Sequence, residues 1–144
     1  MKKVIMCALI AMTNAITMAG DIEDVAATIW DEARGEGFEG RQYVASVIWN
    51  RAKGDGSKMR AVCAKRKQFS GWKDGKAPSV IRVNAKDEAI WKECLAFAKA
   101  LVNEQFTPVT TATHYHATYV HPKWASKLKF VCKVGRHKFY NEEA

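Results

Sequence analysis

The sequence predicts a single α+β domain that is mainly helical and ends in a small antiparallel β element. Three stretches within residues 21–103 repeat apolar side chains at helical spacing, whereas residues 107–140 are rich in β-branched and aromatic residues that favour strands. A length of 144 residues is typical of one domain, and a 48% share of hydrophobic residues supplies apolar surface for a core. No repeat, low-complexity segment or internal linker points to a second domain.

The first twenty residues have the pattern of a targeting segment. Lys2 and Lys3 precede an apolar run from Val4 to Ala19, whose end carries small residues. We expect export, with residues 1–20 acting either as a cleaved signal peptide or as a releasable anchor that contacts the membrane transiently. Losing the two lysines lowers the formal net charge from +8 to +6, so residues 21–144 still favour anionic polymers. Nucleic acid is excluded as a partner, because an exported chain seldom meets it.

The first predicted helix begins at Asp21, which is placed to cap it, and ends at the glycines Gly35 and Gly37. Glu32 falls in its last turn, on the apolar face, so the helix delivers this carboxyl group to the buried side. That face is marked by residues at the i, i+3, i+4 and i+7 positions, which are Ile22, Val25, Ala26 and Ile29.

Glu32 is the candidate catalytic residue. A carboxylic acid held against apolar neighbours has a raised pKa, because desolvation disfavours the charged form. A raised pKa is what a general acid needs near neutral pH. The structural alternative is a glutamate at a helix end that pairs with Arg34 or a lysine. Glu36 supplies a second carboxylate four residues later.

Two further helices follow. The second covers about residues 40–53 and ends at the glycine-rich loop 54–57; its shared face holds Val44, Val47, Ile48 and Arg51. The third opens with Asn84 as its cap and Asp87 three residues on, and it ends near residue 103. Its central stripe is expected to lie in the core and consists of Ile90, Cys94, Phe97 and Leu101.

Between these helices, residues 58–83 are basic and are predicted to be irregular. Phe69 and Trp72 could simply plug this loop into the core. The interpretation we favour is that they offer a sugar ring an apolar face, while Gln68 and Ser70 hydrogen-bond its edges.

The carboxy-terminal third predicts strands at residues 107–119 and 128–140, with Gly135 as a turn or bulge. Residues 105–141 contain no aspartate or glutamate, so this region cannot supply a second acid to a cleft. A two-carboxylate glycosidase would need Glu36, Asp55 or Asp74 for that role. The composition instead favours a single carboxyl group that acts first as acid and then as base, with the sugar's own hydroxyl as nucleophile and an anhydro product.

The histidines and the basic surface support two other hypotheses. His114 and His116 alternate along a predicted strand and should share one face. With His121 or His137 they could form the three-histidine zinc site of an amidase or peptidase, although no H-E-x-x-H motif supports one. The third hypothesis is a wall-binding module without catalysis.

Four cysteines occur, at positions 7, 63, 94 and 132. In an oxidising compartment we expect one disulfide, between Cys63 and Cys94, with Cys132 as a free thiol. If the amino-terminal segment is kept, Cys7 could complete a second pair. No CxxC motif suggests a metal or redox site.

Several short motifs stand in a specific order and spacing along residues 22–140. They are Glu32-Ala33-Arg34-Gly35-Glu36, Gly40-Arg41-Gln42, the segment VASVIWNR at 44–51, Gln68-Phe69-Ser70, Ala112-Thr113-His114-Tyr115-His116, Pro122-Lys123-Trp124-Ala125 and the segment GRHKFY at 135–140. In these motifs the sequence resembles the SleB/CwlJ-type cell-wall hydrolases, a family that includes spore-cortex-lytic enzymes and phage endolysins.

The resemblance implies a lysozyme-like fold in residues 21–144 and cleavage of peptidoglycan between N-acetylmuramic acid and N-acetylglucosamine, as a lytic transglycosylase or a muramidase. It implies Glu32 as the catalytic acid, with Glu36 and Thr113 in support. The expected substrate-binding residues are Gln68, Phe69, Ser70, His114, Tyr115 and His116.

We therefore expect an exported, monomeric peptidoglycan glycosidase of the periplasm or cell wall of a bacterial host. We favour a phage endolysin, with a bacterial cell-wall remodelling enzyme or a resident prophage product as the alternative. Its expected partners are glycan strands and anionic envelope polymers. We expect neither a metal nor another cofactor.

Overall fold

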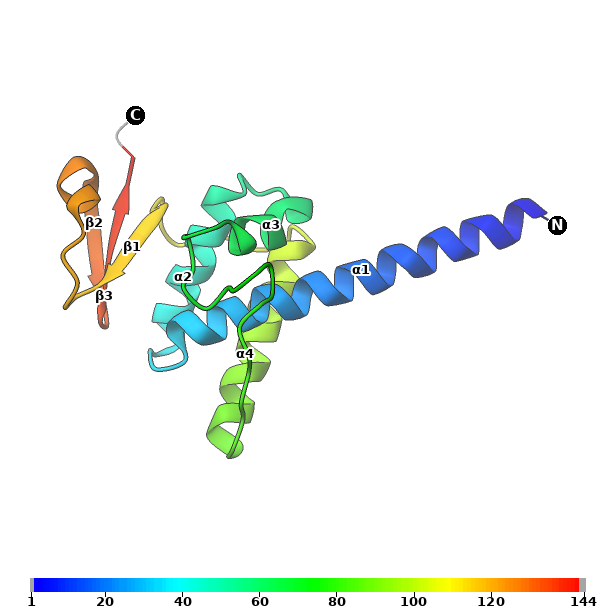
Figure 1. Ribbon diagram of the computed structural model, residues 1–144, viewed down its shortest axis with the longest axis horizontal. Coiled ribbons are helices and arrows are strands. Elements are labelled where there is room, and N and C mark those ends of the chain that lie inside the picture. Colours follow the sequence, from blue (N-terminus) through cyan, green and yellow to red (C-terminus); the bar gives the residue numbers. More distant parts are fainter. Residues whose placement is uncertain (1, 143–144) are drawn as a thin grey trace.

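The structure is a computed structural model that describes residues 2–142, with side chains from residue 17 onward. In this part of the chain it has four α-helices and a three-stranded antiparallel sheet (Figure 1). The helices are α1 (Lys2–Ala33), α2 (Phe38–Arg51), α3 (Met59–Ala64) and α4 (Ala85–Val102), and the strands are β1 (His114–Ala117), β2 (Lys129–Val134) and β3 (His137–Asn141). The predicted fold class, mainly helical α+β with a small carboxy-terminal sheet, is confirmed.

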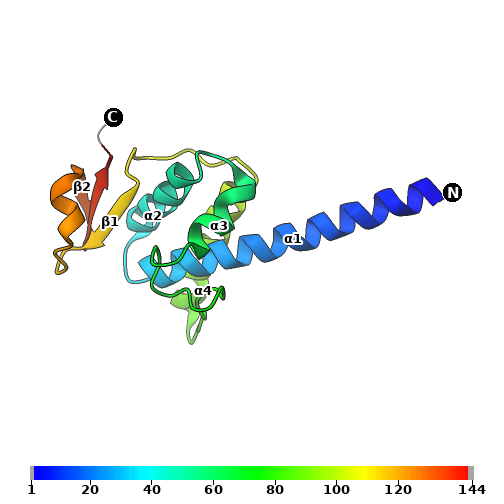
Figure 2. The same cartoon turned by 45° about the horizontal axis from the view of Figure 1, so that its top comes forward.

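Helix α1 is much longer than predicted, because the helix continues without a break through residues 2–20. The prediction that Asp21 caps it is therefore wrong. Alanine, methionine and leucine in the first twenty residues favour helix, and Asp21 lies inside it, facing Arg60 at 3.9 Å. Figures 1 and 2 show the amino-terminal half of α1 extending away from the rest of the molecule. Within the described residues, no helix has both the length and the apolar character to cross a membrane.

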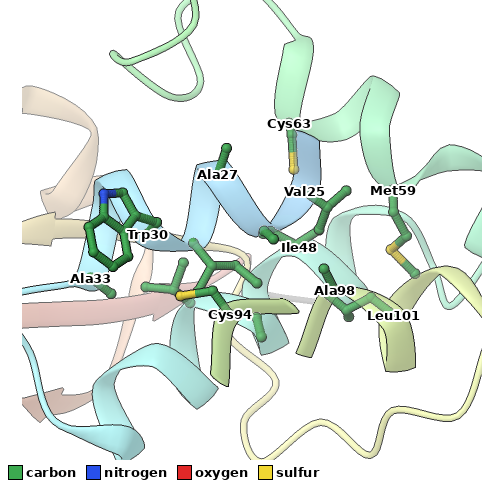
Figure 3. Close-up of a cluster of buried hydrophobic side chains, with 14 of the residues drawn as sticks. Val25, Ala27, Trp30, Ala33, Ile48, Met59, Cys63, Cys94, Ala98 and Leu101 are labelled. Carbon is green, nitrogen blue, oxygen red and sulfur yellow. The ribbon is translucent and has the colours of Figure 1, made fainter. Parts of the chain in front are cut away.

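Helices α2, α3 and α4 pack around the carboxy-terminal half of α1 (Figure 3). The largest fully buried side chain is Trp30 of α1, whose ring meets the edge of Trp91 of α4 at a centroid distance of 6.2 Å. Other fully buried members of this core are Val25, Ile29, Val44, Ile48, Met59 and Leu101. The core thus fixes the last turn of α1, where Glu32 lies.

The cap of α4 is as predicted, since the Asn84 side chain accepts a hydrogen bond from the Asp87 backbone N–H at 2.8 Å. The buried face of α4 is rotated from the predicted stripe. It contains Trp91, Cys94, Ala98, Leu101 and Val102, whereas Ile90 and Phe97 are only partly buried. Ala98 and Cys94 are small, which lets this face approach α1 closely.

The structure also corrects two expectations about residues 58–83 and the cysteines. This segment includes the six-residue helix α3, which is too short to show a periodic pattern. Cys63 of α3 and Cys94 of α4 are buried free thiols, so the expected disulfide between them is not present. The two side chains enter the core from different helices that each pack on α1 (Figure 3). Cys132 is also free, and the side chain of Cys7 lies outside the described residues.

The sheet has the strand order β1-β3-β2, with β3 in the centre. Residues 128–140 form a hairpin that turns at Gly135, whose φ of +55° favours glycine. Phe139 of β3 is fully buried and packs with Val47 of α2 and Ala112, which joins the sheet to the helices. This contact places β1 next to the end of α1.

Candidate active site

Glu32 lies where the last turn of α1 meets strand β1. The hydroxyl of Tyr115 donates a hydrogen bond of 2.6 Å to Oε2 of Glu32. The neighbours of Glu32 on α1, Trp30 and Ala33, are buried in the core. Glu32 itself is half-buried, so the helix turns it toward the packed side of α1, as its phase predicted.

The surroundings of Glu32 favour its protonated form. Burial raises the pKa of Glu32, and the charge of Asp31 raises it further, whereas the bond from Tyr115 and the charge of Arg51 act in the opposite direction. Burial and the nearby Glu32 hold the pKa of Tyr115 well above its usual value, so its hydroxyl stays protonated and remains a donor. Glu32 therefore has the properties of a general acid.

Arg51 is a site residue that the sequence placed on the buried face of a helix without assigning it a role. Its Nε donates to the carbonyl oxygen of Thr113 at 2.6 Å, and its guanidinium lies over the ring of Phe69, 5.4 Å from the centroid. Arg51 thus brings together the end of α2, the loop before β1 and the loop after α3. A cation within an otherwise apolar helical face was the signal for it in the sequence.

We expect Tyr115→Phe to move the alkaline limb of the pH–rate profile to higher pH. The lost bond stabilises ionised Glu32, so its removal raises the pKa of Glu32 and keeps the acid protonated over a wider range. The rate should fall by about tenfold or more, because a hydrogen bond to a charged group contributes about 1.5–3 kcal/mol. Tyr119→Phe is the matched control, since Tyr119 is 79% exposed. An unchanged profile would show that Tyr115 does not act on the acid.

A pocket of about 330 Å³ is lined by Arg51, the residue whose charge acts on Glu32, although Glu32 itself is not among its lining residues. The ends of α2 and α3, the loop after α3 and the start of β1 form its walls. Its lining residues are Asn50, Arg51, Lys53, Val62, Lys65, Gln68, Thr113, His114 and Glu142. A second hollow, lined in part by Trp49, Pro108 and Thr110, shares Asn50, Lys53 and Thr113 with it.

The structure divides the predicted substrate-binding residues. The pocket is lined by Gln68, His114 and the predicted supporting residue Thr113. Ser70, two residues after Gln68, is exposed to solvent. Phe69 is only 2% exposed and lies under Arg51, so the prediction that it stacks on a sugar is wrong. Trp72 also packs inward, and its Nε1 donates to the hydroxyl of Thr28 at 2.8 Å.

His114 and His116 share one face of β1, as predicted, and both rings contact Trp124, at centroid distances of 5.4 and 5.6 Å. His116 Nε2 also lies 2.9 Å from the Tyr140 hydroxyl. Burial and the charge of Arg51 lower the pKa of His114, which favours its neutral form. Tyr115 points to the other face of β1, toward Glu32, so its observed contact is with the acid.

The histidines are not arranged as the zinc hypothesis requires. His137 lies against Tyr115, 5.0 Å between ring centroids, and beside Glu36, whereas His114 and His116 gather around Trp124. Among residues whose side chains are described, no group of three or more histidine, cysteine, aspartate or glutamate residues is placed to hold a metal ion.

Glu36 supports the site by joining the end of α1 to the β2–β3 hairpin. Its Oε1 accepts a hydrogen bond of 3.0 Å from the Arg136 backbone N–H and lies 3.6 Å from Nδ1 of His137. Gly135 leaves room for this contact, because a Cβ there would come within 2.4 Å of Glu36 Oε2. The buried Arg41 also holds the turn after α1, by donating to the carbonyl oxygens of Ala33 and Glu36.

The other carboxylates considered as partners of Glu32 lie in loops and turns. Asp55 caps the short helix Gly56–Lys58 by accepting a hydrogen bond from the Ser57 N–H at 3.0 Å. Asp74 lies in a turn with a φ of +52°. The carboxylate whose charge does act on Glu32 is its neighbour Asp31, which the sequence analysis did not select.

Comparisons with known proteins give matches at the level of family and fold. A family model described as Cell Wall Hydrolase matches residues 35–140. The catalytic domain of the germination-specific lytic transglycosylase SleB from Bacillus anthracis is 22% identical, with a TM-score of 0.59 over 84% of this chain and 93% of that chain. The catalytic domain of the Bacillus cereus SleB protein is also 22% identical, with a TM-score of 0.58 over 84% and 89%. No curated protein sequence gives a significant match.

At this level of identity the two structures establish the fold, and they confirm the predicted lysozyme-like α+β architecture. The family match begins three residues after Glu32 and includes Glu36. Glu32 is therefore a candidate acid because of its environment. Tyr115 and Arg51 act on it, and its helix is packed in the core.

Proposed function

Since the chain belongs to the cell wall hydrolase family, as its resemblance to the SleB/CwlJ-type enzymes predicted, we propose that it cleaves the glycan strands of peptidoglycan. The bond cut is the one between N-acetylmuramic acid and N-acetylglucosamine, and Glu32 is the catalytic acid. The observation that supports this most directly is the 2.6 Å hydrogen bond from Tyr115 to a glutamate whose pKa is raised by burial. A carboxyl group held toward its protonated form is what protonation of a glycosidic oxygen requires.

In this proposal each oxygen of Glu32 has a separate role, which the hydrogen bond from Tyr115 supports. Because Tyr115 donates to Oε2, the acidic proton resides on Oε1 and passes from there to the glycosidic oxygen as the bond to the leaving sugar breaks. Glu32 is then a carboxylate, and the hydroxyl of Tyr115 and the charge of Arg51 stabilise it.

The same carboxylate then acts as the base. It takes a proton from the muramic acid's own hydroxyl, which closes an anhydro ring, or from water, which gives a reducing end. Glu36 and Asp55 are engaged in structural hydrogen bonds, and residues 105–141 contain no carboxylate. This inventory supports a single-carboxylate, lytic transglycosylase route, in which the neighbouring Asp31 raises the pKa of Glu32 and does not act on the sugar.

The proposal is tested by mass spectrometry of the muropeptides released from purified peptidoglycan. We expect muramic acid with anhydro ends, which is the transglycosylase product. Reducing muramic acid ends would instead assign a muramidase, with water as the nucleophile. Freed peptides on intact glycan would overturn the proposal in favour of an amidase or peptidase, and no cleavage at all would leave a binding module.

We further propose that the enzyme is exported to the periplasm or cell wall and serves there as a phage endolysin. The amino-terminal pattern of Lys2, Lys3 and an apolar run supports export. The net charge of +8 supports attraction to anionic envelope polymers, an effect that salt weakens. Amino-terminal sequencing of the protein recovered from the periplasm distinguishes a cleaved signal peptide from a retained anchor.

A further inference from the structure

We propose that the pocket lined by Arg51, Lys53 and Lys65 binds the acidic peptide that the glycan carries, so that the enzyme recognises peptide-bearing strands through carboxylates as well as through sugar. This inference rests on the proposed function, because it assigns the chemistry of the substrate at the same site.

The side chains that line the pocket carry a net positive charge. Three cationic side chains line it, Arg51, Lys53 and Lys65, against the single carboxylate of Glu142. His114 is its other titratable group, and its lowered pKa favours the neutral ring. The sugars of the glycan are uncharged where the lactyl group of muramic acid is amide-linked to its peptide. A cationic pocket is therefore matched to carboxylates of the attached peptide rather than to the sugar rings.

The guanidinium group of Arg51 is only partly hydrogen-bonded. Of its guanidinium nitrogens, Nε is engaged by the Thr113 carbonyl oxygen, and the buried Nη1 has no hydrogen-bond partner among the described residues. Glu32 is a carboxyl group whose charge acts on Arg51, and burial holds it toward its neutral form. Arg51 lines the pocket and forms no salt bridge within the described residues, so an incoming carboxylate would compensate its positive charge.

Lys53 and Lys65 extend this positive wall toward solvent. Lys53 follows the end of α2 with a φ of +53°, and Lys65 follows the end of α3, so both stand at the rim. Neither lysine forms a salt bridge within the described part of the chain, and both are exposed. Arg51 both lines the pocket and acts through its charge on Glu32, so it links the pocket to the proposed acid.

The experiment measures KM and kcat of the full chain on a soluble peptide-bearing glycan, on the same glycan with its peptide carboxylates amidated, and on glycan stripped of peptide. We expect Lys53→Gln with Lys65→Gln to raise KM for the native substrate by about 3- to 10-fold, since each exposed ion pair contributes up to about 1 kcal/mol. The kcat should stay unchanged. Amidation should raise KM for the wild-type enzyme similarly and abolish the effect of the substitutions.

The matched control is Lys86→Gln with Lys92→Gln, two exposed lysines of α4 whose loss changes the net charge equally. An equal rise of KM in this control, or an equal effect of the pocket substitutions on the amidated glycan, would overturn the peptide assignment. An effect seen only with stripped glycan would also overturn it, because the free lactyl group would then be the anion recognised. Failure of the wild-type enzyme to cleave any of the three substrates would refute the proposed function itself.

Discussion

Glu32→Gln should lower the rate of glycan cleavage by about 10²–10⁴-fold, the usual contribution of a general acid. The amide keeps the shape of the side chain and can still accept the hydrogen bond from Tyr115, but it has no acidic proton to transfer. The measurement is the initial rate of turbidity loss of purified peptidoglycan, together with quantification of the released muropeptides. Activity within a few-fold of the wild-type rate would remove Glu32 from the mechanism.

The stability of this variant provides a second readout. The pKa of Glu32 is raised in the folded state, so its ionisation opposes folding once the pH exceeds the value for the unfolded chain. Glutamine cannot ionise, so the variant avoids the free-energy cost of a buried negative charge. Its free energy of unfolding should equal that of the wild type at acidic pH. It should exceed the wild-type value as the pH rises from the pKa of Glu32 in the unfolded chain through its higher pKa in the folded protein. Glu39→Gln on the exposed start of α2 is the control, with no expected change in rate.

Trp30→Ala should lower the free energy of unfolding by about 3–5 kcal/mol, the usual cost of truncating a buried tryptophan. Trp30 is 1% exposed and fills the core between α1 and α4, where it meets the edge of Trp91. Arg34 also lies over its ring, 5.9 Å from the centroid. Equilibrium denaturation in urea, followed by circular dichroism, measures the change.

Trp30→Phe is the informative comparison. Phenylalanine keeps most of the apolar contact, and it removes the indole Nε1, which is buried without a hydrogen-bond partner in the described structure. The phenylalanine variant should therefore lose much less stability than the alanine variant. If the two variants unfolded at the same urea concentration, packing of Trp30 against Trp91 would not be the stabilising contact.

Helix periodicity and capping predicted the elements whose signals are local. Asn84 caps α4 as expected, and the helical phase that carried Val25 and Ile29 into the core also carried Glu32 to its edge. Asp21 shows the limit of such signals. Its side chain suits a cap, but the residues before it also favour helix, so the helix did not begin there.

The contacts of the site depend on residues far apart in the sequence. Tyr115 is 83 positions from Glu32, and both its neighbours His114 and His116 face the opposite side of β1. The strand alternation predicted two faces without showing which face meets the acid. Packing of Phe139 against α2 decided that, by seating the sheet so that Tyr115 points at Glu32.

In the basic loop at residues 65–78, too, the role of the aromatic residues depends on long-range packing. The composition of the loop is equally compatible with an aromatic ring buried in the core and with one that stacks on a sugar. Tertiary packing placed Phe69 beneath Arg51 and left Gln68 on the wall of the pocket. Burial of an aromatic ring is favourable wherever a neighbouring element covers it, and the loop sequence does not encode which element that is.

The α+β class, the helix that presents Glu32 and the absence of carboxylates from residues 105–141 follow from spacing and composition. Tertiary packing, in contrast, made Tyr115 and Arg51 the groups that act on Glu32, and it placed Glu36 against the β2–β3 hairpin. The physical reason is that helical phase is set by neighbouring residues. The raised pKa of an acid is set instead by whatever the fold packs around it.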